Sequence, residues 1–452
     1  MNKMIKFYNT LTGKKDELKP IKKNYINFFV CGATVYDFPH IGHAKTYIQF
    51  DFIVKYLRCK KFKVFYLQNI TDIDDKIIQR AKEKSISWKE LSKKFEDIFY
   101  EDMKSLHVDS VTKYARATDH IKEIESQVNR LIKKGYAYKI EDGYYFDLSK
   151  FKEYGKLSGR KYLEAEDSMT RIDESINKRN KGDFCLWKFS KNDDPSWKSK
   201  LGDGRPGWHI EDTAITEKFF GPQYDIHGGA RDLIFPHHEA EIAQMESISG
   251  KKPLVKYWIH IGFLNVQGTK MSKSLKNFIT IRDALKEYDY KVLRFFFFTN
   301  HYSKPIDFSD ANLEQAKNSL ERIKEFISRS KGKKGNVNKE LIEKARKSFF
   351  DALNDDFDTP KATSVLFDFI REANKNDIGN NCYRLMKEID AIFDLFDFTE
   401  EKIPKEIKLL AEKRENYRQL KDWKKSDEIR EEIRKKGYLI EDINKGYNIK
   451  KQ

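Results

Sequence analysis

The chain has 452 residues, with 87 Lys and Arg against 71 Asp and Glu, and a formal net charge of +16 at pH 7. This length predicts three or four domains around a large core, and the charge is compatible with a polyanionic partner such as RNA, although an abundance of lysine can also reflect a biased genome. The four cysteines, Cys31, Cys59, Cys185 and Cys382, form no disulfide framework, and no apolar run is long enough for a signal peptide or membrane span, which predicts a cytoplasmic protein without membrane association.

Residues 1–112 are predicted to form the first half of a nucleotide-binding α/β fold. A short strand at residues 5–9 is followed by apolar strands at 25–30 and 63–69, with a helix that opens at about His40 between the last two. Ligands of open α/β sheets lie beyond the carboxyl ends of the strands, so Cys31 and the segment from Thr71 are expected at a site. Taken alone, Cys31 is equally an inert small hydrophobe, and the aspartates after Thr71 are equally helix caps.

Irregular patterning at residues 113–206, with a helix at 118–134 and short strands, predicts an insertion. The second half of the fold is expected at residues 207–265, and a basic loop region at 266–310 follows it. Apolar residues at helical spacing through residues 311–400 predict an antiparallel helix bundle.

The last segment, residues 401–452, contains 16 basic and 11 acidic residues. Tyr417, Trp423 and Tyr447 are expected to be exposed on this basic surface. Aromatic and cationic side chains together suit unstacked RNA bases, while a solvated pair of charged helices is the simpler alternative.

His40, Gly42 and His43 fall on the first turn of the predicted helix. Free backbone N–H groups and the helix dipole favour phosphate there, the imidazoles add donors, and Gly42 leaves room for a flat base. By itself, this tetrapeptide is weak support for a site, because two exposed histidines at a helix start would look the same.

Lys270 and Lys273 lie in a second motif, in a loop after an apolar strand at residues 258–263. Two lysines among small hydroxylated residues suit a mobile loop that closes over a polyphosphate and meets charge developing on the leaving group. A solvated loop in a lysine-rich chain is the alternative, but the two motifs in this order favour one nucleotide site.

The two motifs resemble the signature sequences of class I aminoacyl-tRNA synthetases, which activate an amino acid with ATP. Further stretches, Cys31-Gly32 and residues 69–75, 204–211 and 227–239, resemble the cysteinyl-tRNA synthetase family over nearly the whole chain. The resemblance implies an α/β fold: a split Rossmann-type parallel sheet with an inserted subdomain, then a helical bundle and a small C-terminal anticodon-binding domain. It also implies that the protein activates L-cysteine with ATP and Mg²⁺ and transfers it to tRNA(Cys). Nothing in the sequence suggests more than a monomer, and the oligomeric state stays open.

The same resemblance implies roles for individual residues. ATP would contact His40, Gly42, His43, Gly229, Asp232, Lys270 and Lys273, of which the two histidines and two lysines would be catalytic, and cysteine would contact Cys31, Gly32, Thr71, Trp208 and His227. The lysine loop would lie in a region that contacts the stem of the tRNA.

In that family a zinc ion held by two Cys, one His and one Glu binds the thiolate of the substrate. The matching residues are Cys31, His237 and Glu241, and Asp212 stands where the family has its second Cys. His237 and Glu241 are four apart on a helix that Pro236 would start, so they share one face, although such a pair is more often on the surface. A carboxylate in place of the thiolate leaves the summed charge of the four ligands unchanged, but it is a harder ligand. We therefore expect one bound zinc ion, with other metals competing for the site more strongly than in a site with two thiolates.

Two alternatives remain at this point. A cysteine ligase of the mycothiol pathway shares the adenylation site but has no anticodon module, and residues 401–452 argue against it. A catalytically silent RNA-binding paralogue is disfavoured by the intact histidine and lysine pairs, although Asp212 keeps it open.

Overall fold

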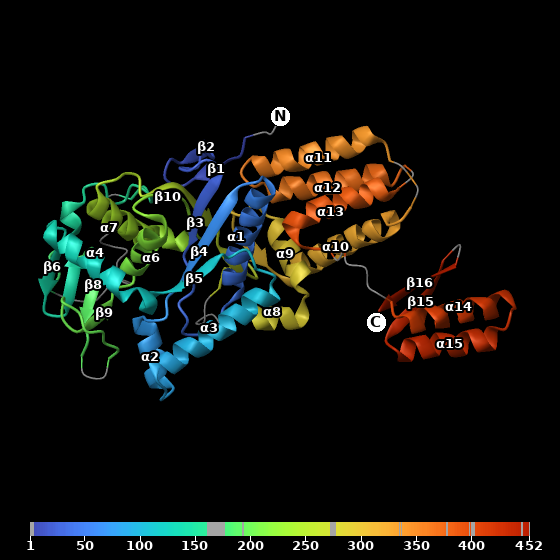
Figure 1. The fold of residues 1–452 in the computed structure, drawn as a ribbon, viewed down its shortest axis with the longest axis horizontal. Coiled ribbons are helices and arrows are strands. Elements are labelled where there is room, and N and C mark those ends of the chain that lie inside the picture. The colour runs from blue at the N-terminus through green and yellow to red at the C-terminus, as the bar shows by residue number, and fades with distance from the viewer. Residues whose placement is uncertain are drawn as a thin grey trace. The chain divides into compact units, whose positions relative to one another are not determined.

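The computed structural model describes residues 4–160, 177–191, 194–271, 277–333, 335, 337–376, 378–396, 398, 403–443 and 446–451. The chain forms two compact units, residues 1–396 and 397–452, and the first contains the parallel-sheet α/β fold (Figure 1). Every helix among the described residues is too short or too polar to span a lipid bilayer.

The core of the first unit is a five-stranded sheet in the order β11-β10-β3-β4-β5, and every neighbouring pair is parallel. Its strands are β3 (Tyr25–Val30), β4 (Lys63–Ile70), β5 (Lys113–Arg116), β10 (Tyr224–Ala230) and β11 (Val255–Ile261). The chain runs outward from β3 to β5 and returns on the other side at β10. The predicted split parallel sheet is confirmed, and the strand order reverses between β3 and β10, where open sheets place their ligands.

The helix α1 (Ile41–Cys59) is buried along most of its length, which explains why its apolar residues do not form a single stripe. Asp51 on α1 forms a fully buried ion pair with Arg294 of α9 (Tyr290–Phe298), at 2.9 Å. Arg294 also donates to the carbonyls of Phe393, Leu106 and His107. These bonds fix α1, which begins at the histidine motif, against the helices that follow the sheet.

The predicted insertion contains an antiparallel sheet in the order β6-β7-β8-β9. The strands are β6 (Ala137–Ile140), β7 (Gly143–Phe146), β8 (Phe184–Phe189) and β9 (Gly204–Pro206), and the neighbouring helices are α4 (Ile121–Lys133), α6 (Ile210–Phe220) and α7 (Glu239–Ser249). The helix start predicted at Pro236 agrees with the structure, because the turn at residues 234–238 is broken at Phe235 and helical backbone continues from Pro236 into α7, whose hydrogen-bonded span begins at Glu239. Phe235 is extended there, as the residue before a proline prefers.

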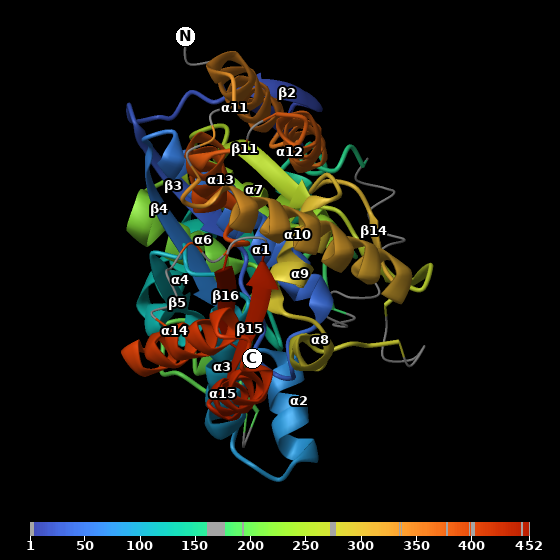
Figure 2. The same cartoon turned by 90° about the vertical axis from the view of Figure 1, so that its right-hand side faces the viewer.

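The remaining elements of the first unit lie at its edges and in the helical region. They are β1 (Lys6–Asn9), β2 (Lys14–Glu17), α2 (Asp75–Glu83), α3 (Trp88–Ser105), β12 (Leu264–Val266), β13 (Thr269–Lys270), α8 (Ile281–Glu287), β14 (Ile306–Phe308), α10 (Asp310–Ser330), α11 (Lys339–Asn354), α12 (Thr359–Ala373) and α13 (Asn380–Phe393). Helices α10 to α13 lie side by side in Figures 1 and 2, in agreement with the predicted bundle. The side chain of Lys270 and all of Lys273 lie outside the described residues.

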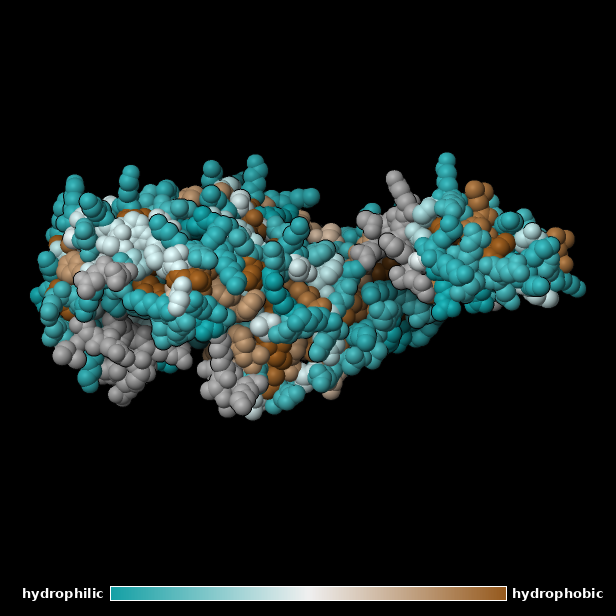
Figure 3. Space-filling model, turned by 90° about the horizontal axis from the view of Figure 1, so that it is seen from below, coloured by the Kyte–Doolittle hydropathy of each residue, from teal (hydrophilic) through white to brown (hydrophobic). Residues whose placement is uncertain are grey.

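The second unit consists of α14 (Lys405–Gln419), α15 (Trp423–Lys435) and the hairpin of β15 (Tyr438–Ile443) and β16 (Gly446–Lys451). Its core is small: Ile407, Ala411, Ile429, Ile433 and Ile440. Its surface in Figure 3 is mostly hydrophilic, with some hydrophobic side chains among the charges.

Of the three aromatic residues that were expected to be exposed in this unit, only Trp423 is, with 58% of its surface accessible. The expectation was wrong for Tyr417 and Tyr447, which are partly buried against the small core. Five aliphatic side chains make only a small core, and these two rings extend it together with Ile403, Leu410, Tyr438 and Ile449.

Candidate active site

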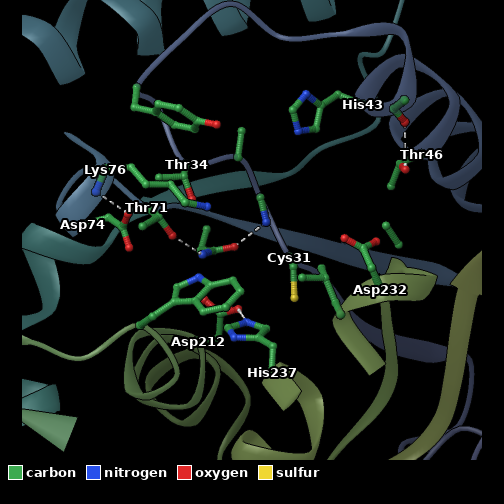
Figure 4. A pocket seen from close by; sticks show the side chains of 18 of the residues that line it. Cys31, Thr34, His43, Thr46, Thr71, Asp74, Lys76, Asp212, Asp232 and His237 are labelled. Atoms are coloured by element: carbon green, nitrogen blue, oxygen red, sulfur yellow. Dashed lines mark hydrogen bonds and ion pairs between the residues drawn. The ribbon is translucent and has the colours of Figure 1, made fainter. Parts of the chain in front are cut away.

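A cavity of about 1000 Å³ opens beyond the carboxyl ends of β3, β4 and β10. Ten of the predicted site residues line it: Cys31, Gly32, His40, Gly42, His43, Thr71, Trp208, Asp212, Asp232 and His237. His227, Gly229 and Glu241 are buried and lie outside the lining of this cavity. In Figure 4, Cys31, Asp212 and His237 gather at one side of the cavity, and His43 comes from α1.

The two histidines of the first motif cap α1. The Nδ1 atom of His40 accepts from the backbone N–H groups of Gly42 (3.1 Å) and His43 (3.4 Å), and Nδ1 of His43 accepts from the N–H of His40 (3.2 Å). Because both Nδ1 atoms accept, a neutral ring at either position carries its proton on Nε2. Burial, with a smaller contribution from His40, lowers the pKa of His43 well below its usual value, so this ring is neutral at pH 7.

The two imidazoles stack with 3.8 Å between ring centroids. A Cβ atom at Gly42 would lie 2.9 Å from the ring of His40, so a side chain there would push that ring out of its place. The capped helix start therefore holds a pair of ring N–H donors at the edge of the cavity.

Lys45, two residues beyond the motif, is buried beneath it. Its Nζ atom donates to three backbone carbonyls, of Gly262 (2.7 Å), Phe263 (3.0 Å) and Lys304 (2.9 Å). Gly262 and Phe263 directly precede the β12–β13 hairpin from which the lysine loop continues. Lys45 thus ties the histidine helix to the base of the lysine loop, a contact that sequence reasoning missed because it depends on where the two segments cross.

A chain of hydrogen bonds links Thr71 to the end of β3. The hydroxyl of Thr71 donates to Oε2 of Glu211 (3.0 Å), the amide of Asn69 donates to that hydroxyl (3.3 Å), and Oδ1 of Asn69 accepts from the N–H of Gly32 (2.5 Å). A Cβ atom at Gly32 would lie 1.7 Å from the carbonyl oxygen of Asn69, so only glycine permits this approach. Glu211 is a site residue that the sequence analysis did not assign.

Four predicted metal ligands, Cys31, Asp212, His237 and Glu241, converge, with the first three lining the cavity and Glu241 outside its lining. All four are buried, and their donor atoms lie within 4.8 Å of one another. Nε2 of His237 lies 3.0 Å from Oδ2 of Asp212 and 3.2 Å from Oε1 of Glu241, and its Nδ1 atom is held by His209 at 2.8 Å. The ring of Trp208 stacks on that of His237 at 4.5 Å.

The chemistry of these side chains fits a bound cation. The buried carboxylates of Asp212 and Glu241 lie close to the thiol of Cys31. Among the described residues, the ion-pair partners of these carboxylates are histidines, and none is a Lys or Arg. Burial, with the charges of Asp212 and Glu241, raises the pKa of Cys31 well above its usual value, and burial beside Asp212 does the same for Glu241. Oδ1 of Asp212 is buried without a hydrogen-bond partner among the described residues. A divalent ion would satisfy all of these groups.

Comparison with known proteins identifies the family. The family of "tRNA synthetases class I (C) catalytic domain" matches residues 17–318, and the DALR domain matches residues 348–396. The cysteine–tRNA ligase of Thermococcus gammatolerans is 44% identical, covering 98% of both chains, and that of Thermoplasma volcanium is 46% identical, covering 96% of this chain and 97% of its own.

Solved structures share the fold at much lower identity. Methionyl-tRNA synthetase of Mycobacterium tuberculosis in complex with methionyl-adenylate superimposes with a TM-score of 0.61 at 16% identity, covering 81% of this chain and 88% of its own. A leucyl-tRNA synthetase complex of Agrobacterium radiobacter gives 0.61 at 9% identity, covering 83% and 85%. From its sequence matches, with the parallel sheet and cavity in agreement, the chain belongs to the cysteine–tRNA ligase family of class I tRNA synthetases.

Proposed function

We propose that this protein activates L-cysteine with ATP to cysteinyl-adenylate and pyrophosphate, and then transfers cysteine to the 3′-terminal adenosine of tRNA(Cys). The observation that carries the proposal is the meeting of two sites in one cavity: the capped histidine pair at the start of α1 and the cluster of Cys31, Asp212, His237 and Glu241. The family and its named relatives support the same reaction.

His40 and His43 would bind the phosphates of ATP. Their Nε2–H groups and the N-terminus of α1 provide donors for oxygen atoms that gain charge as the cysteine carboxylate attacks the α-phosphorus. The bond from the α-phosphorus to the bridging oxygen then breaks, and pyrophosphate leaves with that electron pair. Lys270 and Lys273 would stabilise this leaving charge, and Mg²⁺ would accompany the nucleotide. The backbone around Gly42 would face adenine, with Gly229 and Asp232 near the ribose.

Thr71, Gly32, Trp208 and His227 would form the cysteine pocket. The Thr71 hydroxyl donates its hydrogen bond to Glu211, which leaves a lone pair of that oxygen for the ammonium group of the substrate. Trp208, stacked on His237, would close over the small side chain.

Zinc would be held by Cys31, Asp212, His237 and Glu241, where it supplies a thiophilic contact that prefers the sulfur of cysteine to the oxygen of serine. The four side chains would offer the ion one sulfur, one nitrogen and two carboxylate donors. Asp212 makes this set harder than one with two thiolates, so its affinity for zinc should be lower.

The second unit would bind the anticodon through its basic surface and Trp423. This assignment separates the proposed enzyme from a ligase that transfers cysteine to a sugar amine, which needs no such module. The domain limits proposed from the sequence, with an anticodon-binding domain at residues 401–452, belong to the same proposal.

The direct experiment is aminoacylation of a tRNA(Cys) transcript with radiolabelled L-cysteine, beside an amino sugar as the competing acceptor. Labelled tRNA whose formation depends on ATP and on cysteine supports the proposal. Adenylate formation with transfer to the sugar but not to tRNA would contradict it.

A further inference from the structure

Cys31 and Glu241 belong to a second possible metal-binding set. Among the described residues, two overlapping groups of four side chains can each hold a metal ion: Cys31, Asp212, His237 and Glu241, and Cys31, His227, His238 and Glu241. We call the first the open set, because Cys31, Asp212 and His237 line the cavity, and the second the closed set, because His227 and His238 lie behind it. The donor atoms of the closed set also lie within 4.8 Å of one another, and all four residues are buried.

The shared side chains face both sets. Sγ of Cys31 lies 3.3 Å from Nε2 of His227 and 3.2 Å from Nε2 of His238. Oε1 of Glu241 lies 3.2 Å from Nε2 of His237 in the open set, while Oε2 lies 3.4 Å from Nδ1 of His227, the ring nitrogen that does not face Cys31; in the closed set one oxygen of Glu241 lies within 4.8 Å of each other donor atom. Because both sets need the same thiolate and the same carboxylate, they can hold one ion at a time.

The two additional histidines of the closed set are supported in the way that metal-binding imidazoles usually are. Nδ1 of His227 lies 2.7 Å from the hydroxyl of Tyr224, and Nδ1 of His238 lies 2.9 Å from Nε2 of His260. Nδ1 of His260 in turn lies 2.7 Å from the hydroxyl of Thr10. Both hydroxyls can accept a hydrogen bond from a ring N–H, directly for His227 and through His260 for His238, so both Nε2 atoms can present a lone pair toward Cys31.

The donor types of the closed set suit zinc, an ion of intermediate softness, better than those of the open set. The closed set provides one sulfur, two imidazole nitrogens and one carboxylate, whereas Asp212 leaves the open set with one sulfur, one nitrogen and two carboxylates. Zinc binds imidazole and thiolate in preference to additional carboxylate. A thiolate at position 212 would reverse that preference, so the competition between the sets follows from Asp212.

We propose that, without cysteine, this protein holds its metal ion in the closed set of Cys31, His227, His238 and Glu241, and that the open set is filled when cysteine provides a further sulfur. The inference rests on the proposed function only for the identity of that amino acid. The closed set is a resting site in which three of the four ligands, His227, His238 and Glu241, lie outside the lining of the cavity.

The first test is X-ray absorption spectroscopy of the zinc-loaded full chain without substrate. The expected spectrum has one sulfur and the outer-shell scattering of two imidazole rings, and added L-cysteine should change this to two sulfurs and one imidazole. One imidazole in the absence of cysteine would overturn the proposal.

The second test is zinc affinity by chelator competition, without cysteine, in a matched pair of variants. His238→Gln removes a ligand of the closed set only, and His237→Gln removes a ligand of the open set only. We expect affinity to fall by at least about tenfold in His238→Gln, since altered metal-site imidazoles cost this much or more, and to be retained in His237→Gln. The reverse result would overturn the proposal.

The Asp212→Cys background distinguishes loss of a metal ligand in His238→Gln from a folding defect. In that background the open set has two thiolates, so adding His238→Gln should no longer lower zinc affinity. An equal loss in both backgrounds would show that His238 acts on the fold rather than as a ligand, and would overturn the proposal. Cysteine-dependent ATP–pyrophosphate exchange on the same samples tests the proposed function separately, because zinc binding is measured without ATP or tRNA.

Discussion

The two units of this chain differ in the side chains that they carry and in how deeply these are buried. All ten histidines precede residue 302, and five of them, His209, His227, His237, His238 and His260, are buried around Cys31. The second unit has no histidine, a core of five aliphatic residues, and an exposed Trp423 on a surface rich in Lys and Arg. The difference teaches that the proposed chemistry lies where burial fixes the donors, while the proposed RNA binding lies where aromatic and cationic groups remain accessible.

The largest expected effect is a loss of adenylate formation, and it comes from a substitution in the first unit alone. Lys273→Ala should slow cysteinyl-adenylate formation by about 10- to 1000-fold, because one charge contact to the leaving pyrophosphate is lost. Cysteine-dependent ATP–pyrophosphate exchange measures it, and Lys251→Ala, at an exposed lysine, is the control. Exchange at the wild-type rate in Lys273→Ala would remove this lysine from the mechanism.

A second variant changes the second unit and is expected to weaken tRNA binding. Trp423→Ala should raise the KM for tRNA(Cys) by roughly 5- to 150-fold, the equivalent of about 1 to 3 kcal/mol of lost base stacking, while ATP–pyrophosphate exchange stays unchanged. Leu420→Ala is the matched control, because Leu420 is even more exposed, at 76%, but cannot stack on a base. Equal effects of the two substitutions would contradict a stacking role.

The smallest expected effect is on stability and concerns the buried side chain of Lys45 beneath the histidine motif. Burial lowers the pKa of Lys45 to about 7, against 10.5 in the unfolded chain. Between these values the unfolded chain binds a proton that the folded one does not, so Lys45 makes the free energy of unfolding rise with pH, by at most about 1.4 kcal/mol per unit.

Denaturant unfolding of the wild type and Lys45→Met at pH 7, 8 and 9 measures this contribution. The difference between the two proteins should change with pH, because every other titrating group is common to both. Lys45→Arg should resemble Lys45→Met in lacking the slope, since an arginine stays charged throughout this range. A difference that is independent of pH would show that Lys45 remains protonated, held by its three carbonyl acceptors.

Much of the fold could be predicted from local pattern. The strands β3 and β4 are apolar runs, and α1 starts at His40 because a side chain that accepts from backbone N–H groups ends the preceding loop. The convergence of Cys31, Asp212, His237 and Glu241 required the family resemblance, because nothing local brings β3, α6 and α7 together.

Other parts of the site could not be predicted from sequence. His238 and His260 are neighbours because β11, which carries His260, pairs with β10, so their contact depends on the strand order. Tyr417 and Tyr447 were misjudged because a charged surrounding sequence hides how small the core of the second unit is. Lys45 was missed because a lysine in a lysine-rich chain gives no sign of being buried.

The most direct test of the central claim, that a metal site containing Asp212 still selects cysteine, is ATP–pyrophosphate exchange with cysteine and with serine, together with metal content on the same sample. We predict exchange with cysteine and not with serine, at about one zinc ion per chain, and loss of cysteine exchange when a chelator removes the ion. Undiminished cysteine exchange after the zinc has been removed would contradict the account.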